Sequence, residues 1–366
     1  MSFRFVKMLC AVAIGLVVPA LASAQVTPAA GYVPPDDTPS IKVGAVIFAD
    51  YTYTDSPESK DADGNTYNPS AFQVTRSYIN ITGNISHLIA FRITPDVTRE
   101  TFVGPAVSGS LVFRLKYAYG QFNLDDWMTH GSWLRFGIQQ TPLVDYQEGI
   151  YRYRFQGQTF TEREGYLTSS DAGASFHYNF GNNYGDIHAG IYNGEGYSKP
   201  EANNQPAFQI RGTVRPLAHG ASGLRGLRFT GFYDSDAYMK NDEKKRALFE
   251  TSFEHKYLNA AYDYLHTEDQ VTALVKTITG SGYSFWLTPK STFGLEGLIR
   301  YDHFTPDDTI DNRKRDRTIV GIAYWFKHQG NVTSAMMLDY DSANFDNFTP
   351  SLPRQTKIAL HGLINF

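Results

Sequence analysis

The feature that most constrains the fold of this chain is a repeated alternation of apolar and polar side chains within short segments. In LVFRLKYAY (111–119) most odd-numbered residues are apolar or aromatic, whereas Arg114 and Lys116 fall on the other set of positions. FQIRGTVR (208–215) and TFGLEGLIRYD (292–302) repeat the alternation. Because side chains of a strand alternate between its two faces, these segments are predicted to be strands with one oily face and one charged face.

Such segments follow one another along most of the chain, each about ten residues long and bounded by turn residues. About sixteen are found, near 41–54, 71–84, 88–98, 110–121, 132–140, 171–181, 185–193, 206–216, 224–234, 246–256, 257–266, 276–288, 292–303, 316–327, 331–341 and 355–366.

The charged faces favour one kind of surrounding. Charges placed on one face of strand after strand are difficult to bury in the core of a soluble sandwich, but they suit a lumen filled with water. Beyond the first 24 residues the sequence has no apolar run of about 18 residues, so no transmembrane helix is predicted. A closed β-barrel is then the way in which this chain can span a membrane.

The first residues are typical of an export signal. Arg4 and Lys7 precede an apolar stretch at 8–21, and Ala22-Ser23-Ala24 follows it. This arrangement predicts a secretory signal peptide at 1–24 with cleavage after Ala24. A membrane anchor is the less favoured interpretation, because the apolar stretch is short for a span.

Cysteine content and charge exclude two classes of protein. Cys10 is the only cysteine, so the exported chain would have none, which excludes a small disulfide-stapled fold. Without Arg4 and Lys7, 31 basic residues stand against 37 acidic ones, a formal charge of −6. This balance gives no reason to expect nucleic acid as a partner.

The predicted connections alternate between short and long, as in barrels of the outer membrane. The short ones are expected on the periplasmic side, at 83–87, 181–185, 255–257, 288–291 and 327–331. The long ones are expected outside, at 55–69, 193–205, 234–246, 304–316 and 342–354, and the longish 123–131 is an exception. The predicted fold is therefore all-β, a transmembrane antiparallel barrel of about 16 strands spanning 41–366, after a periplasmic lead-in at 25–40.

The last predicted strand, KIALHGLINF (357–366), ends on Phe366. Ile358, Leu360 and Ile364 share its apolar face with that ring. Phe366 is predicted to close the barrel and to act as the signal that the bacterial barrel-assembly machinery recognises.

Several stretches resemble the phosphate-selective porin O and P family, in order and spacing. They are FQVTRSYINITGNIS (72–86), FRITPDV (91–97), YAYGQF (117–122), LRFGIQQTPLVDY (134–146), SSDAGASFHYNF (169–180), GIYNGEGYSK (190–199) and FQIRGTVRPL (208–217). The resemblance covers about 70–220 and implies a trimeric diffusion porin of a Gram-negative outer membrane. Members that select phosphate are basic inside, whereas this chain is net acidic, so phosphate selectivity stays open.

The longest connection, 140–170, follows the fifth predicted strand. The resemblance implies that this loop folds into the lumen and narrows it. Its candidate constriction residues are Asp145, Glu148, Arg152, Arg154 and Arg163, with Glu162 and Glu164 beside them. The strands are expected to contribute lumen residues Arg76, Arg92, Arg114, Lys116, Arg135, Arg211 and Arg215.

Opposed acids and bases across a narrow aqueous gap produce a transverse field that filters ions. Arg92, Arg114 and Arg135 lie on three consecutive predicted strands and would form one cationic patch. The alternative is that these arginines only neutralise the loop carboxylates and hold the loop in place.

The sequence gives little support for metal binding or catalysis. DADGN (61–65) and DDTID (307–311) lack the spacing of a calcium loop, which leaves solvated acidic loops or weak bridging of lipopolysaccharide by divalent cations. The ten histidines show no zinc-ligand spacing, and no G-x-S-x-G occurs. No metal, cofactor or catalytic residue is therefore expected. Four aromatic residues are interpreted as membrane-interface residues rather than a sugar-stacking track: Tyr117, Tyr119, Tyr301 and Trp325.

The sequence thus predicts an outer-membrane porin for small hydrophilic solutes, mildly anion-preferring and homotrimeric, whose partners are membrane lipid and lipopolysaccharide. The competing hypotheses are a barrel enzyme and a structural or adhesive barrel with a closed lumen.

Overall fold

The computed structural model describes residues 37–100, 108–272 and 274–366. The predicted signal peptide at 1–24 and the part of the lead-in at 25–36 lie outside the described residues.

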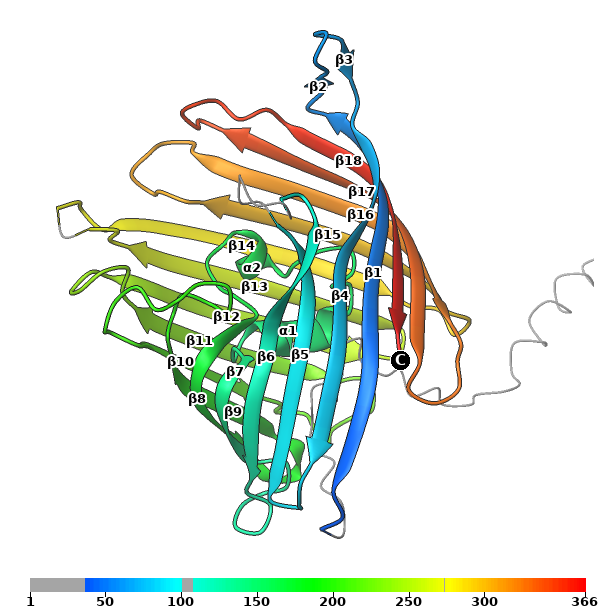
Figure 1. Ribbon diagram of the computed structural model, residues 1–366, viewed down its shortest axis with the longest axis vertical. Coiled ribbons are helices and arrows are strands. Elements are labelled where there is room, and N and C mark those ends of the chain that lie inside the picture. The colour runs from blue at the N-terminus through cyan, green and yellow to red at the C-terminus, as the bar shows by residue number, and fades with distance from the viewer. Residues whose placement is uncertain (1–36, 101–107, 273) are drawn as a thin grey trace, which may run out of the picture.

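Sixteen antiparallel strands close into one barrel, which confirms the predicted fold (Figure 1). Each strand pairs with its neighbours in sequence, and β1 pairs with both β4 and β18 to complete the ring. The strands are β1 (Ser40–Ser56), β4 (Ser70–Asn84), β5 (Ile89–Arg99), β6 (Leu111–Asn123), β7 (Trp133–Gln140), β8 (Ser170–Asn179), β9 (Gly185–Tyr192), β10 (Ala207–Val214), β11 (Leu227–Asp236), β12 (Lys244–His255), β13 (Leu258–Asp269), β14 (Ile278–Pro289), β15 (Leu295–Thr305), β16 (Lys314–Phe326), β17 (Thr333–Asp346) and β18 (Gln355–Asn365).

The predicted alternation of faces is visible in β15. Arg300 and Asp302 point into the barrel and are buried, whereas Leu295 and Ile299 lie on the outer wall and are exposed. The barrel therefore buries its charged face and presents its apolar face to the surroundings, the inverse of a soluble sandwich.

A bulge in β6 overturns one expectation. Thr94 pairs with Tyr117 and the next residue of β5, Pro95, pairs with Leu115, so Lys116 has no partner in this register. An extra residue shifts the side-chain alternation by one. Tyr117 and Tyr119 consequently face the lumen, where they are 3% and 5% exposed, and their assignment to the membrane interface was wrong.

The interface assignment of Trp325 was wrong as well. Trp325 shares the inner face of β16 with Ile319 and Ala323, and all three are buried. Tyr301 lies on the outer face of β15 and is partly exposed, as predicted.

The connections are short at one end of the barrel and long at the other, apart from 124–132 and 215–226 at the short end. The small hairpin of β2 (Ser59–Lys60) and β3 (Thr66–Tyr67) projects from the long-loop end (Figure 1). Three predicted long loops are shorter than expected, because β11 continues to Asp236, β15 to Thr305 and β17 to Asp346.

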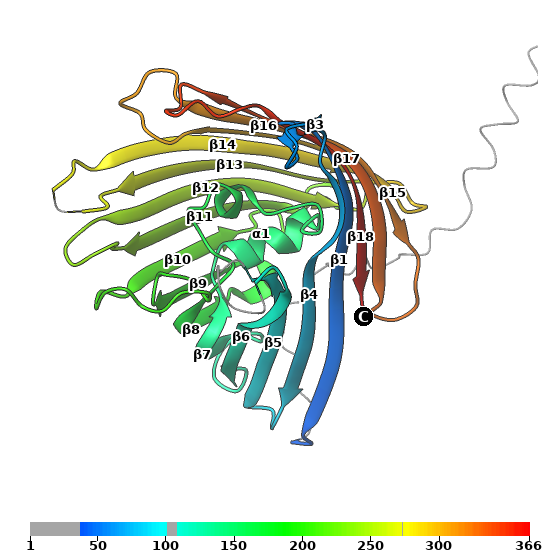
Figure 2. The same cartoon turned by 45° about the horizontal axis from the view of Figure 1, so that its top comes forward.

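The segment between β7 and β8, residues 141–169, lies inside the barrel (Figures 1 and 2). It carries α1 (Val144–Tyr151) and α2 (Phe160–Arg163), and a short 3-10 turn, η1 (Gly181–Asn183), follows β8. No helix of the described residues is long and apolar enough to cross a membrane.

Candidate pore constriction

Helix α1 is hydrogen-bonded to one part of the barrel wall. The Gln147 side chain donates to Glu250 at 2.9 Å, and Asn259 donates to the carbonyl of Ile150 at 3.1 Å. The hydroxyl of Tyr146 lies 2.9 Å from the donating hydroxyl of Thr230. These partners belong to β11, β12 and β13, so α1 is held against that side of the lumen.

The chain after α1 is anchored further round the same wall. Arg152 contacts Glu296 at 3.2 Å, and the Tyr153 hydroxyl donates to the same carboxylate at 3.0 Å. Gln156 donates to Asp339 at 2.8 Å. The segment therefore reaches from β7 across the lumen to β15 and β17.

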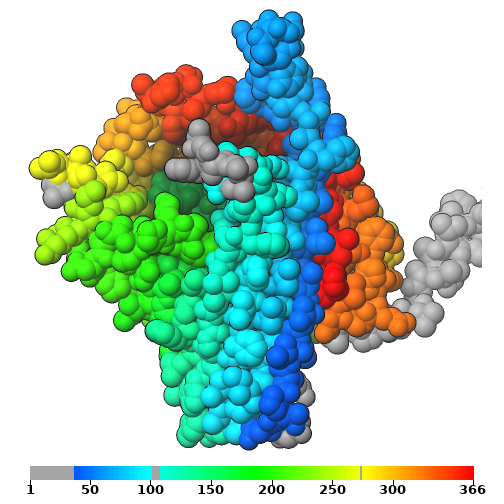
Figure 3. Space-filling model, in the orientation of Figure 1, coloured from blue at the N-terminus to red at the C-terminus, as the bar shows by residue number. Residues whose placement is uncertain are grey.

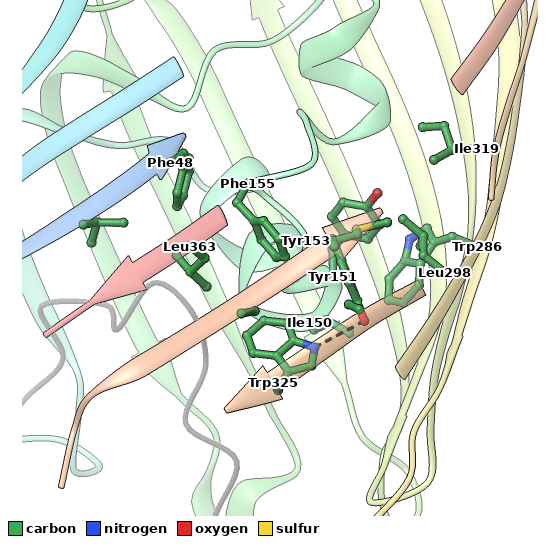
Figure 4. Close-up of a cluster of buried hydrophobic side chains, with 14 of the residues drawn as sticks. Phe48, Ile150, Tyr151, Tyr153, Phe155, Trp286, Leu298, Ile319, Trp325 and Leu363 are labelled. Carbon is green, nitrogen blue, oxygen red and sulfur yellow. Dashed lines mark hydrogen bonds between the residues drawn. The ribbon is translucent and has the colours of Figure 1, made fainter. Parts of the chain in front are cut away.

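Apolar packing reinforces this anchoring. Tyr153 and Phe155 pack against Trp325, with ring centroids 5.7 and 5.8 Å apart, and Phe155 also packs against Phe48 of β1 (Figure 4). The Trp325 indole N–H points at the Tyr153 hydroxyl (Figure 4). A second buried cluster joins the two ends of the segment to β11, β12, β13 and β15 and contains Leu143, Val144, Phe160, Leu167, Phe232, Leu248, Leu265 and Phe304.

Within the segment, Arg154 pairs with Glu148 at 2.7 Å and with Glu162 at 3.0 Å, and all three side chains are buried. Burial raises the pKa of Glu148, and the adjacent Arg154 opposes that rise. These ion pairs connect α1 to α2 and stabilise the conformation of the segment.

The opposite wall, formed by β4 to β7, carries the basic residues predicted from the sequence. Arg76 and Arg114 both contact Asp96, at 3.1 and 2.9 Å, and the Asp96 side chain is fully buried. These two arginines therefore share one wall carboxylate, which balances one of their two positive charges. The expected patch of Arg92, Arg114 and Arg135 does not form as a set of equivalent charges.

Three other basic residues of this wall, Arg92, Lys116 and Arg135, donate hydrogen bonds to uncharged groups. Arg92 donates to Thr94 and Asn80, at 2.9 and 2.7 Å. Lys116 donates to the Tyr78 hydroxyl at 3.1 Å.

Arg135 donates to Gln121 and Gln140, at 2.8 and 3.2 Å. Its guanidinium also lies over the rings of Tyr119 and Trp133, at 4.7 and 3.7 Å from the centroids. Similarly, the Arg92 guanidinium lies 4.4 Å from the centre of the Tyr117 ring. Aromatic faces attract cations, so these rings hold the charges without neutralising them.

Asp145 and Glu148 of α1 are the acids that face these cations. Burial raises the pKa of Asp145, and the positive charges of Arg135 and Arg92 oppose that rise. The predicted opposition of loop acids to wall bases is thus present in space, with Lys116 near Glu148.

The remaining predicted residues lie elsewhere. Arg211 contacts Asp186 of β9 and donates to the carbonyl of Pro142 at 2.8 Å, at the start of the segment. Arg215 lies beyond the end of β10 and donates to Asn183 at 2.6 Å, away from the segment.

Arg163, by contrast, sits within the segment, on the side that faces β15 to β17. It donates to Gln156 at 3.3 Å. Burial lowers its pKa to about 10, and the nearby positive charges of Arg300 and Arg317 add to this effect.

Sequence reasoning missed the role of Asp96 and of the lumen tyrosines. The pairing of Asp96 with two arginines depends on the register between neighbouring strands, which the pattern of a single strand does not give. Nothing in the local sequence around Tyr117 indicated the bulge that turns this residue into the lumen.

Every strand of the barrel contributes at least one buried residue to the lumen wall. Each of the sixteen strands contributes an inward-facing residue that is no more than 6% exposed: Phe48, Tyr78, Arg92, Tyr119, Arg135, Ser175, His188, Arg211, Thr230, Glu250, Asp263, Ser284, Arg300, Ile319, Asp339 and His361. The space-filling view shows a recess at the long-loop end of the molecule (Figure 3). Segment 141–169 therefore occupies much of the lumen, while other inward-facing side chains, Arg76, Arg114 and Lys357, stay partly exposed.

Comparison with solved structures places this fold among outer-membrane channels. An anion-selective porin from Comamonas acidovorans matches with a TM-score of 0.60 and 11% identity, over 90% of this chain and 100% of that one. The outer membrane channel DcaP of Acinetobacter baumannii matches with a TM-score of 0.58 and 12% identity, over 92% and 100%. A loop-deletion mutant of OmpT, an outer membrane protein of Vibrio cholerae, matches with 0.59 and 13%, over 90% and 100%.

The chain thus has the porin fold. No protein-family model matches it, and no curated protein is similar to it, so the phosphate-selective family stays a prediction. Among the described residues no group of three or more potential metal ligands occurs.

Proposed function

We propose that this chain is an outer-membrane channel for passive diffusion of small hydrophilic solutes, with a mild preference for anions and no catalytic role. The observation that carries the proposal is the set of Arg92, Lys116 and Arg135, which lie on adjacent strands inside the barrel and donate to neutral acceptors. Cations held in this way leave a net positive potential along one wall, and such a wall favours anions over cations.

The electrostatic energy expected from these charges is large enough to affect ion selectivity. In a narrow aqueous passage two charges about 4 Å apart interact by about 1–4 kcal/mol, depending on the local dielectric. A difference of about 1.4 kcal/mol changes partitioning tenfold. The loop acids Asp145 and Glu148 reduce this field, which supports a mild rather than a strong preference.

The test is conductance in planar bilayers. Stepwise openings with a reversal potential on the anion side in a salt gradient support the proposal. A correctly folded barrel that shows no channel openings would instead favour the alternative of a structural or adhesive protein with a closed lumen. The packing of segment 141–169 inside the lumen makes this alternative worth testing.

The resemblance to the phosphate-selective family makes inorganic phosphate the first anion to test. A saturable site would reduce single-channel chloride current at low phosphate concentration. A current that depends only on ionic strength would indicate a general anion pathway.

Placement in the outer membrane, among phospholipid and lipopolysaccharide, is part of the proposal. Tags near Asp61, Asn203 and Lys240 should be reachable on intact cells, whereas tags at Asn183 or Lys290 should not. The first group lies at the long-loop end of the barrel and the second at the short-turn end. Labelling of the second group alone would reject this orientation.

We further propose that the chain forms a homotrimer. One solved structure with this fold, OmpT of Vibrio cholerae, is described as a trimer form. Light scattering of the detergent complex should give a protein mass three times that of the chain, and a monomeric mass would reject the proposal.

A further inference from the structure

The two sides of segment 141–169 differ in how firmly they are held. On the side of β11 to β17, two buried apolar clusters combine with hydrogen bonds donated by Gln147, Arg152 and Gln156 and with one accepted by the Ile150 carbonyl. Packed apolar cores are rigid, and moving this side would expose large aromatic side chains to water.

The side of the segment that faces β5 to β7 meets basic and aromatic side chains of the wall instead of an apolar cluster. There the wall presents long cationic side chains stacked on tyrosines: Arg92 on Tyr117, Arg135 on Tyr119, and Lys116 beside Tyr78. Lysine and arginine change rotamer without moving the backbone, so this layer can rearrange while the barrel and the segment stay in place.

This layer also contains unsatisfied polar atoms. One terminal nitrogen of Arg92, the Tyr119 hydroxyl and the Gln140 amide nitrogen are buried and make no hydrogen bond in the described structure. Buried donors without partners are costly, and water entering beside them would satisfy them. Unsatisfied atoms occur on the anchored side as well, among them Gln147 Oε1 and Asp263 Oδ1, so the two sides differ in apolar packing and not in the number of satisfied polar groups.

We propose that Arg92, Lys116 and Arg135, with Tyr117 and Tyr119, form a side-chain gate on the β5–β7 wall, and that segment 141–169 is a fixed stop against which the gate closes. The inference rests on the proposed channel function. The structure is then the closed state, and opening requires rotation of wall side chains, with no movement of α1.

A cross-link tests whether the segment moves. Cys10 is the only cysteine and lies in the predicted signal peptide, so introduced cysteines pair only with each other. Asn259 contacts the Ile150 carbonyl, which makes Ile150→Cys with Asn259→Cys a suitable pair for a disulfide between α1 and β13. Openings of the cross-linked protein should match those after reduction, with the extent of cross-linking measured by mass spectrometry.

Substitutions test the gate itself. Lys116→Ala shortens a gate side chain and should raise single-channel conductance by about twofold, since pore conductance depends on the cross-section. Lys116→Met keeps the volume and removes the charge, so it should change ion selectivity more than conductance. Arg228→Ala is the matched control, because Arg228 pairs with Glu254 on a distant part of the wall.

The outcomes are distinguishable. Openings that survive the cross-link, together with a larger conductance for Lys116→Ala, support the side-chain gate. Openings that disappear on oxidation and return on reduction overturn it, because the segment must then move, while the channel function stands. Silence of the wild type and of Lys116→Ala, with both folded by heat-modified gel mobility, rejects the channel function and the gate together.

Discussion

His361 and Asp50 lie directly opposite each other across the seam where the last strand meets the first, with the imidazole Nδ1 3.1 Å from the carboxylate. The other ring nitrogen of His361 lies 3.2 Å from Asp339, which also accepts a hydrogen bond from Gln156. A ring that contacts a carboxylate on each nitrogen can donate to both only as the imidazolium. The buried imidazolium of His361 therefore stabilises the contact between β18 and β1 and, through Asp339, the position of segment 141–169.

His361→Ala should destabilise the barrel, because it leaves Asp50 and Asp339 buried without their shared cation. Breaking a buried ion pair from one side costs about 3–5 kcal/mol. Unfolding in denaturant, followed by heat-modified gel mobility, should show the loss. Asp50→Asn added to His361→Ala should recover part of it, and His328→Ala, on an exposed turn residue, should change nothing.

Replacing Arg92 and Arg135 together by alanine should shift the reversal potential toward cations, because these charges donate to neutral partners. The shift should be largest at low salt, where screening is weak. Arg114→Ala is compared with Arg92→Ala and Arg135→Ala made one at a time, and it should have a smaller effect than either, since Arg114 is already paired with Asp96. Equal effects of the single changes would mean that pairing with Asp96 does not reduce the influence of Arg114.

Asp96→Asn should act in the opposite direction. It removes the carboxylate shared by Arg76 and Arg114 and adds net positive charge to the lumen wall. The reversal potential should move toward anions, accompanied by a loss of stability of about 3 kcal/mol or more because two arginines lose a buried partner. An unchanged reversal potential would place these residues outside the conduction pathway.

At the short-turn end His87 lies between Asp37 and Asp126, at 2.5 and 3.2 Å. The hydrogen bond to Asp37 is the largest cause that raises the pKa of His87 above its usual 6.5. Because the pKa is raised, the contact between His87 and Asp37 contributes its full stabilisation below about pH 6.5, the pKa of the unfolded chain. This stabilisation is lost as the pH rises through the pKa of His87 in the folded protein. Asp37→Asn should lower the His87 pKa in an NMR titration, and an unchanged value would assign the shift to Asp126.

Phe366 is expected to matter more for assembly than for stability. Its backbone pairs with Ala45 of β1, while its ring is 59% exposed. Replacing the ring by alanine should cost at most about 2–3 kcal/mol of apolar burial. Phe366→Ala should therefore leave unassembled chain in cells although the purified protein refolds in detergent. Equal losses in both settings would contradict a role in recognition.

The period-two alternation and the spacing of turn residues were enough to predict sixteen strands and the inward face of most of them. Arg211, Glu296 and Arg300 point inward as the pattern predicts, because a strand has only two faces and lipid tolerates one kind of side chain. That information is local, so the sequence carries it in each segment separately.

What the sequence could not determine depends on contacts between distant segments. The bulge at Lys116 turned Tyr117 and Tyr119 inward because register is settled jointly by β5 and β6. Likewise, whether a lumen arginine is neutralised depends on which carboxylate lies across from it, as the pairing of Asp96 with Arg114 shows. Only the closed barrel brings 141–169 against β11 to β18, and the packing there fixes the position of the segment inside the lumen.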